Sequence, residues 1–135
     1  MEANKGKNNL ITHAIGLYKA AYDLSRDGYQ VKIDTSASKS GHIKIQKNGK
    51  DFYVMIKALT DLVPVPFASD YEITEKFDHL LICVGVYNEL ISYYKLDMQY
   101  ARSKIIQNID KNGEVSHWMN VPDYEEFKVN SLIFP

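Results

Sequence analysis

The sequence predicts an α/β domain built around one mixed sheet, and three observations support this. Apolar residues recur every three or four positions from Asn8 to Asp27, which is the period of an amphipathic helix. Three segments between residues 29 and 59 alternate apolar and polar residues, as half-buried strands do. Residues 79–86 form a nearly continuous apolar run, typical of a strand covered on both faces. At 135 residues, the chain is predicted to form a single domain spanning 1–135.

The first half predicts a helix followed by an antiparallel meander. Gly28 follows the helical segment, at the position where glycine commonly ends a helix. Asn48-Gly49 predicts a tight type I′ turn between the second and third strands. In the third strand, Tyr53, Met55 and Lys57 are expected to share one face. The three predicted strands are residues 29–35 (YQVKIDT), 42–46 (HIKIQ) and 51–59 (DFYVMIKAL).

The second half predicts a long connection, two strands and a helix. Pro64 and Pro66 cannot lie in a central strand, so residues 60–76 are expected to connect the meander to the strand at 79–86. A further strand is predicted at 91–96. We expect a helix from Asp97 to Ile109, capped by Asp97. Residues 111–114 predict a turn, 116–121 an extended piece and 122–127 a short helix opened by proline.

Charge is unevenly distributed along the chain. The formal net charge is −1, yet residues 1–57 hold ten Lys/Arg against five Asp/Glu, and residues 58–135 hold six against twelve. Lysines concentrated between residues 32 and 57 indicate a surface for phosphates, and an ordinary solvated surface is the alternative. These lysines are Lys32, Lys39, Lys44, Lys47, Lys50 and Lys57.

Cysteine content and hydropathy indicate the compartment. Cys83 is the single cysteine, so it forms no internal disulfide and is expected to be a core thiol. No apolar run approaches the roughly 20 residues of a membrane span, and the first residues lack the apolar core of a secretory signal. We therefore expect a cytoplasmic protein with no membrane partner.

The order and spacing of three segments resemble a known superfamily. The segments are YVMIKALTDLVPVPF, KFDHLLICVGV and SHWMNVPDYEEF. Together they are similar to small bacterial members of the restriction endonuclease-like (PD-(D/E)XK) superfamily. The resemblance implies a three-layer α/β sandwich, whose mixed sheet contains an antiparallel three-strand meander and is flanked by helices. It also implies pairing into a homodimer.

The resemblance implies a site that this chain does not fully reproduce. The superfamily places an Asp on the second strand, and an acidic residue two positions before a catalytic Lys on the third, with Mg²⁺ between them. Lys57 matches that lysine, Met55 occupies the acidic position and His42 the Asp position. Because Mg²⁺ needs hard oxygen ligands, a degenerate metal site is predicted. The metal-ligand candidates are His42, Asp34 and Asp51, and Asp70 and Asp78 are further carboxylates that a relocated site would use.

Three functions follow as hypotheses. The first is a nuclease-like domain that binds nucleic acid, expected to be DNA, with weak or no phosphodiester cleavage. The second is an active Mg²⁺-dependent endonuclease with a relocated carboxylate, Asp34 or Asp51, beside Lys57, and Mg²⁺ is expected as a cofactor only in this case. The third is a regulatory subunit that binds protein through the acidic second half. The residues expected to contact nucleic acid are Lys32, Lys39, Lys44, Lys47 and Lys50.

Overall fold

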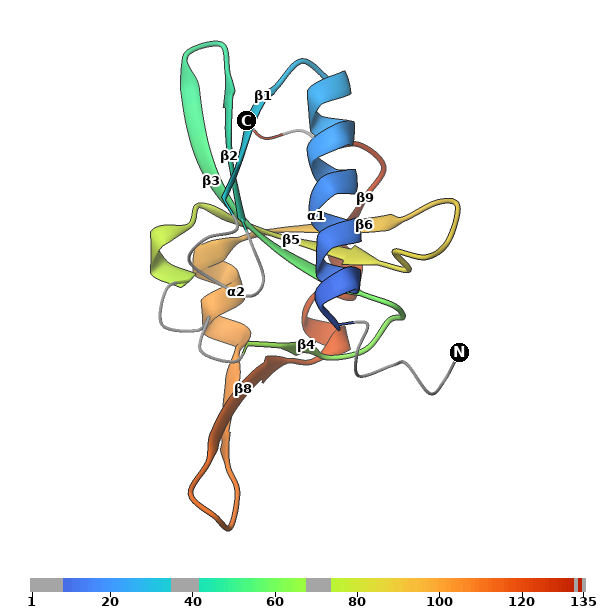
Figure 1. The fold of residues 1–135 in the computed structure, drawn as a ribbon. Coiled ribbons are helices and arrows are strands. Elements are labelled where there is room, and N and C mark those ends of the chain that lie inside the picture. The colour runs from blue at the N-terminus through green and yellow to red at the C-terminus, as the bar shows by residue number, and fades with distance from the viewer. Residues whose placement is uncertain (1–8, 35–41, 68–73, 133, 135) are drawn as a thin grey trace.

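The computed structural model describes residues 9–34, 42–67, 74–132 and 134 (Figure 1). Its elements confirm the predicted α/β class. They are α1 (Asn9–Arg26), β1 (Gln30–Asp34), β2 (His42–Lys47), β3 (Lys50–Leu59), β4 (Val65–Pro66), β5 (His79–Val84), β6 (Ser92–Asp97), α2 (Met98–Lys104), β7 (Ile106–Ile109), β8 (Val115–Met119), the 3₁₀ turns η3 (Val121–Asp123) and η4 (Glu125–Phe127), and β9 (Lys128–Val129). Within the described residues, neither α-helix has the length and apolar character needed to cross a membrane.

The main sheet is mixed, as predicted. Its order is β1-β2-β3-β5-β6-β9. Strands β3 and β5 are parallel, and every other neighbouring pair is antiparallel. A second sheet, of order β4-β8-β7, was not predicted. Strands β7 and β8 project from the body as a narrow hairpin, called the arm below (Figure 1).

The meander forms as the alternation and the Asn-Gly turn predict. Asn48 and Gly49 have φ of 56° and 79°, the left-handed values of a type I′ turn. The turn fixes the register of β2 against β3, which places His42 opposite Met55 and Lys44 opposite Tyr53. Register therefore decides which side chains share a face.

Two hydrophobic clusters lie on opposite faces of the sheet. Helix α1 covers one face, where it packs on alternate residues of β2, β3 and β5. The other face is covered over β3, β5 and β6 by α2, β4, β8 and Tyr124. Strand β5 contributes to both clusters, as its continuous apolar sequence predicted.

The helix predicted from Asp97 to Ile109 is wrong in its second half. Its start is confirmed, since Asp97 Oδ1 accepts a hydrogen bond from Gln99 N at 2.8 Å. The helix ends at Lys104, because Ile105 adopts an extended backbone, and residues 106–109 form β7 instead. Cross-strand pairing of Ile106 with Trp118 and of Ile109 with Val115 replaces the expected helical contacts.

The turn between β7 and β8 explains why the arm forms. Asp110 Oδ1 accepts hydrogen bonds from Asn112 N at 2.8 Å and Glu114 N at 3.0 Å, and Gly113 has a φ of 81°. This local turn competes with helix continuation. The short helix predicted after Pro122 is also corrected: the segment forms two successive 3₁₀ turns, η3 and η4.

Helix α1 approaches the sheet closely at one glycine. A Cβ on Gly16 would lie 2.5 Å from the Cβ of Ala58 on β3, which is closer than real Cβ atoms come. Ala58 is itself buried. The absence of a side chain at Gly16 therefore sets the distance between α1 and β3.

We expect Gly16→Ala to lower the free energy of unfolding by about 1–3 kcal/mol, because the added methyl overpacks this contact. Urea denaturation monitored by circular dichroism measures the change. The double variant Gly16→Ala/Ala58→Gly removes the clash and should be more stable than the sum of the single effects predicts. Strictly additive effects would contradict the close approach.

Candidate functional site

The face of β1, β2 and early β3 that points away from α1 carries polar side chains. Lys32 lies opposite Lys44, and Lys44 lies opposite Tyr53. In the next row towards the hairpin, Gln30 lies opposite Gln46. Residues directly opposite one another on neighbouring strands project to the same side. We call this set the polar face: Gln30, Lys32, Lys44, Gln46, Asp51 and Tyr53.

The polar face carries two lysines, Lys32 and Lys44, and one carboxylate, Asp51. Lys44 Nζ lies 3.6 Å from Asp51 Oδ2 and 5.6 Å from the centroid of the Tyr53 ring. Lys32 is exposed and forms no ion pair with any other described residue. Like charges directly opposite in a sheet are unfavourable; Asp51 offsets the charge of Lys44, and an anion beside Lys32 would offset the other charge of the pair.

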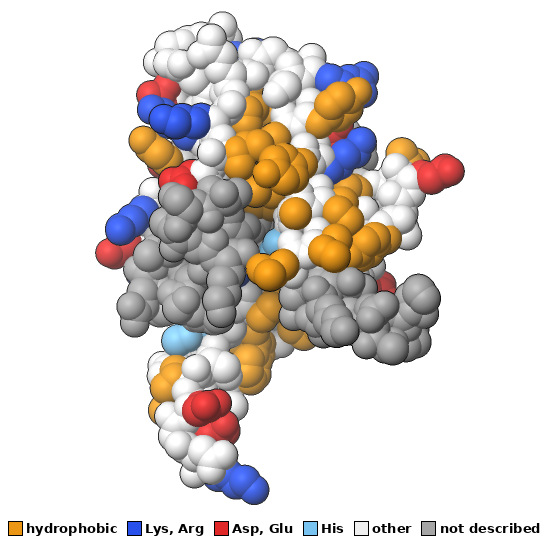
Figure 2. Space-filling view, in the orientation of Figure 1, with side chains coloured by type: hydrophobic (Ala, Val, Ile, Leu, Met, Phe, Trp, Pro, Cys, Tyr) orange, Lys and Arg blue, Asp and Glu red, His pale blue; other side chains and the backbone are white. Residues whose placement is uncertain are grey.

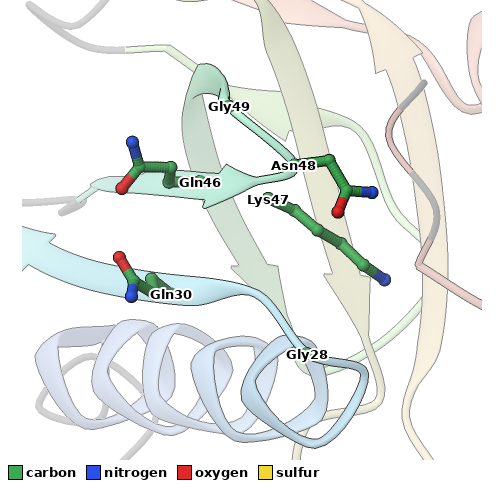
Figure 3. Close-up of a pocket in the computed structure, with 6 residues that line it drawn as sticks. All are labelled: Gly28, Gln30, Gln46, Lys47, Asn48 and Gly49. Carbon is green, nitrogen blue, oxygen red and sulfur yellow. The ribbon is translucent and has the colours of Figure 1, made fainter.

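Two shallow cavities adjoin on this part of the sheet. One has a volume of about 240 Å³ and is lined by Gln30, Val31, Lys32, Lys44 and Gln46. The other, of about 320 Å³, lies at the hairpin end and also includes Gln30 and Gln46 (Figure 3). Both glutamines thus line both cavities, whereas Lys32 and Lys44 line only the first.

Two other lysines predicted to bind phosphate lie on the opposite side of the hairpin, although Lys47 also lines the cavity at the hairpin end. Lys47 and Lys50 pair with each other, on the side of the hairpin facing α1. Lys47 Nζ donates a hydrogen bond to the carbonyl oxygen of Asp27 at 2.8 Å and lies 4.7 Å from the centroid of the Tyr29 ring, so it holds the C-terminal end of α1 (Figure 3). Lys39 lies outside the described residues.

The residues matching the superfamily motif meet at the edge of the polar face. His42 Nε2 lies 3.4 Å from Asp34 Oδ2. The rings of His42 and Phe77 pack in a T-shaped arrangement, with their centroids 4.9 Å apart. Met55, opposite His42, is 2% exposed. Two residues further along β3 is Lys57. We call His42, Asp34, Met55 and Lys57 the corner.

Lys57 is buried in a closed environment. Its exposed fraction is 3%, and its Nζ lies 4.9 Å from the centroid of the Phe67 ring. Phe67 is itself fully buried. A cation over an aromatic face is stabilised by the ring quadrupole, so this packing holds the amine inside the domain.

The corner does not fit Mg²⁺. Asp34 offers a hard oxygen ligand, whereas His42 offers imidazole and Met55 a thioether. Among the described residues, no group of three or more His, Cys, Asp or Glu side chains is placed to hold a metal.

The other carboxylate candidates are placed elsewhere. Asp51 lies opposite Gln46. Gln46 is four residues from His42 on β2, which places Asp51 roughly 14 Å from His42 along the strand at about 3.4 Å per residue. Asp78 Oδ2 accepts a hydrogen bond from Tyr53 N at 2.8 Å, and Asp70 lies outside the described residues. Neither Asp51 nor Asp78 supplies the oxygen ligands that the corner lacks.

Three residues of the polar face were not identified from the sequence. No sequence motif includes Tyr53, Gln30 or Gln46, and the prediction of a phosphate-binding surface was based on lysines only. The alternation of β1, β2 and β3 was the available signal, since it puts them on the same side as Lys32 and Lys44.

Two other reactive side chains have structural roles. His79 packs against the rings of Phe52 at 5.3 Å and Phe134 at 4.8 Å. Burial, and then the charge of Lys95, lower the pKa of His79, which keeps its imidazole neutral at neutral pH. Burial raises the pKa of the Cys83 thiol, so Cys83 is a core residue with little thiolate character.

Comparison of the chain with protein-family models, with curated proteins and with solved structures gave no match.

Proposed function

We propose that this chain is a small restriction endonuclease-like domain that binds nucleic acid and has weak or no phosphodiesterase activity. The observation that supports binding is the polar face, where Lys32 and Lys44 lie opposite each other beside the exposed ring of Tyr53. Lysines contribute affinity through phosphates in a way that is independent of sequence and sensitive to salt.

The order of the elements supports the fold part of the proposal. Helix α1 is followed by the antiparallel meander β1-β2-β3, and β5 then lies parallel to β3. The core that the resemblance implies is a helix, a three-strand meander, a second helix and a further strand. One departure is that the described residues between β3 and β5 form no α-helix.

The composition of the corner supports the loss of cleavage. Met55 replaces an acidic ligand, and its neighbour in register is His42. Lys57 is buried, so its amine would reach a scissile phosphate only after the surrounding side chains had moved. Binding through the polar face requires none of these three residues.

We expect the protein to bind a labelled 20-mer oligonucleotide at low salt, with an affinity that falls steeply as salt rises. Lys32→Gln/Lys44→Gln should reduce the slope of log K against log[salt] by about 1.4–1.8, because two phosphate contacts are lost. Fluorescence anisotropy across a salt series measures this slope. Lys104→Gln/Lys111→Gln is the matched control, since it removes the same charge from α2 and the tip of the arm.

Absence of binding at low salt would overturn the proposal. An equal loss in the two double variants would also count against it, because net charge rather than the polar face would then set the affinity.

We expect no Lys57-dependent cleavage when the protein is incubated with plasmid DNA and Mg²⁺ or Mn²⁺. Agarose gels that compare the wild type with Lys57→Met test this, and the similar length of methionine preserves the packing on Phe67. Nicking that disappears in a folded Lys57→Met variant would instead support the active endonuclease. Asp34→Asn would then identify the relocated carboxylate.

The arm favours a second candidate, a protein-binding regulatory subunit. Its exposed apolar side chains are Ile106, Ile109 and Val115, with exposed fractions of 43%, 61% and 51%. Acidic side chains lie near its tip (Figure 2). Exposed apolar groups rimmed by charge are typical of protein contacts, including the homodimer that the resemblance implies.

If the arm mediates self-association, Ile109→Lys should shift sedimentation from dimer to monomer, because it places a charge in the apolar contact. Leu90→Lys is the control, since Leu90 is 86% exposed and lies in the β5–β6 connection. A wild-type chain that sediments as a monomer at all concentrations would exclude self-association through the arm.

A further inference from the structure

The polar face contains an exposed aromatic ring on a rigid support. Tyr53 is 43% exposed, although it lies on β3, between β2 and β5 in the sheet. Both of its backbone groups are held by Asp78: Tyr53 N donates to Asp78 Oδ2 at 2.8 Å, and Asp78 N donates to the Tyr53 carbonyl oxygen at 2.8 Å. The ring is therefore carried by an anchored strand of the sheet and forms a platform that is not part of a loop.

Charged and amide side chains surround this platform. Lys44 Nζ lies 5.6 Å from the ring centroid, and Lys32 is the next residue across the sheet. One row further along, the exposed amides of Gln30 and Gln46 lie opposite each other and line both cavities. An aromatic ring, two amines and two amides thus share one open surface, together with the carboxylate of Asp51, which pairs with Lys44.

This combination suits unpaired bases better than a duplex. The bases of a duplex stack on one another, so their faces are closed to an aromatic side chain, whereas unpaired bases stack readily on Tyr, Phe or Trp. Amides bind the base edges that pairing would otherwise occupy, and lysines bind the phosphates. A flat sheet face also lacks the protruding element that enters a groove.

We propose, on the basis of the nucleic-acid binding put forward above, that the polar face binds a single-stranded segment of RNA or DNA. One base stacks on Tyr53, the flanking phosphates lie against Lys32 and Lys44, and the amides of Gln30 and Gln46 contact base edges. The corner takes no part in this binding.

Anisotropy with labelled 20-mers tests the assignment on the full-length chain. The probes are one mixed-sequence single strand as RNA, the same sequence as DNA, and the corresponding DNA duplex. Both single strands are expected to bind more tightly than the duplex. Tighter binding of the RNA than of the DNA would indicate contacts to the 2′-hydroxyl, and equal binding would indicate a general single-strand site.

Variants of Tyr53 separate stacking from charge. Tyr53→Ala should weaken single-strand binding at least about fivefold, the loss that corresponds to one stacked base, and should leave duplex binding unchanged. Tyr53→Phe keeps the ring and should bind as the wild type does. Tyr18→Ala is the matched control, because Tyr18 is 57% exposed on α1, on the other side of the sheet. Thermal melting verifies that each variant is folded.

The outcomes distinguish this inference from the proposed function. Duplex binding as tight as single-strand binding, or a Tyr53→Ala variant that binds as Tyr18→Ala does, would overturn the single-strand site. Salt-dependent binding that is lost in Lys32→Gln/Lys44→Gln would still support the proposed function. If the protein bound none of the three probes at low salt, both the single-strand site and the proposed function would be overturned.

Discussion

The close approach of α1 to β3 is the constraint on which the rest of the structure depends. Because Gly16 presents no Cβ to Ala58, the helix lies directly on the even-numbered residues of β3, which join its apolar cluster. The odd-numbered residues must then point the other way. The alternation of side chains along β3 therefore places Tyr53, Met55 and Lys57 on the second face. Through the strand register, it also determines which side chains of β1 and β2 lie on that face.

The second face is divided into two parts of different chemistry. Over β5 and β6 it is apolar and is covered by α2, β4 and Tyr124, whose hydroxyl donates to the Val63 carbonyl oxygen at 2.6 Å. Over β1 and β2 it is polar and exposed. The corner lies on the boundary, where Met55 joins the apolar cluster and His42 is half-buried beside Phe77. A ligand can therefore occupy the polar face without unpacking the apolar part.

Local sequence patterns predicted α1 and the strands of the meander, whereas long-range contacts determined the elements that those patterns did not predict. The period of α1, the alternation of β1 to β3 and the Asn48-Gly49 turn were sufficient for the first half. Residues 105–109 fit a helical period equally well, and pairing with β8 across the Asp110 turn makes residues 106–109 a strand. The lysines illustrate the same limit at the site. The alternation of side chains along β2 predicts that Lys44 and Lys47 lie on opposite faces of the sheet. It does not predict the burial of Lys57, whose amine packs on Phe67 from the connection after β3.

The corner also shows why a methionine at position 55 is compatible with a stable sheet. The site is 2% exposed, and its neighbours in register are His42 and Leu80. A carboxylate there would lose its hydration and would need a bound cation or a nearby amine to remain ionised. Metal binding and folding would then be coupled at this residue. Methionine removes the coupling, since its thioether packs in the apolar cluster without a charge partner. The polar face is free of this constraint, because Lys32 and Lys44 lie outside the apolar cluster, and an anion bound there would leave the core unaffected.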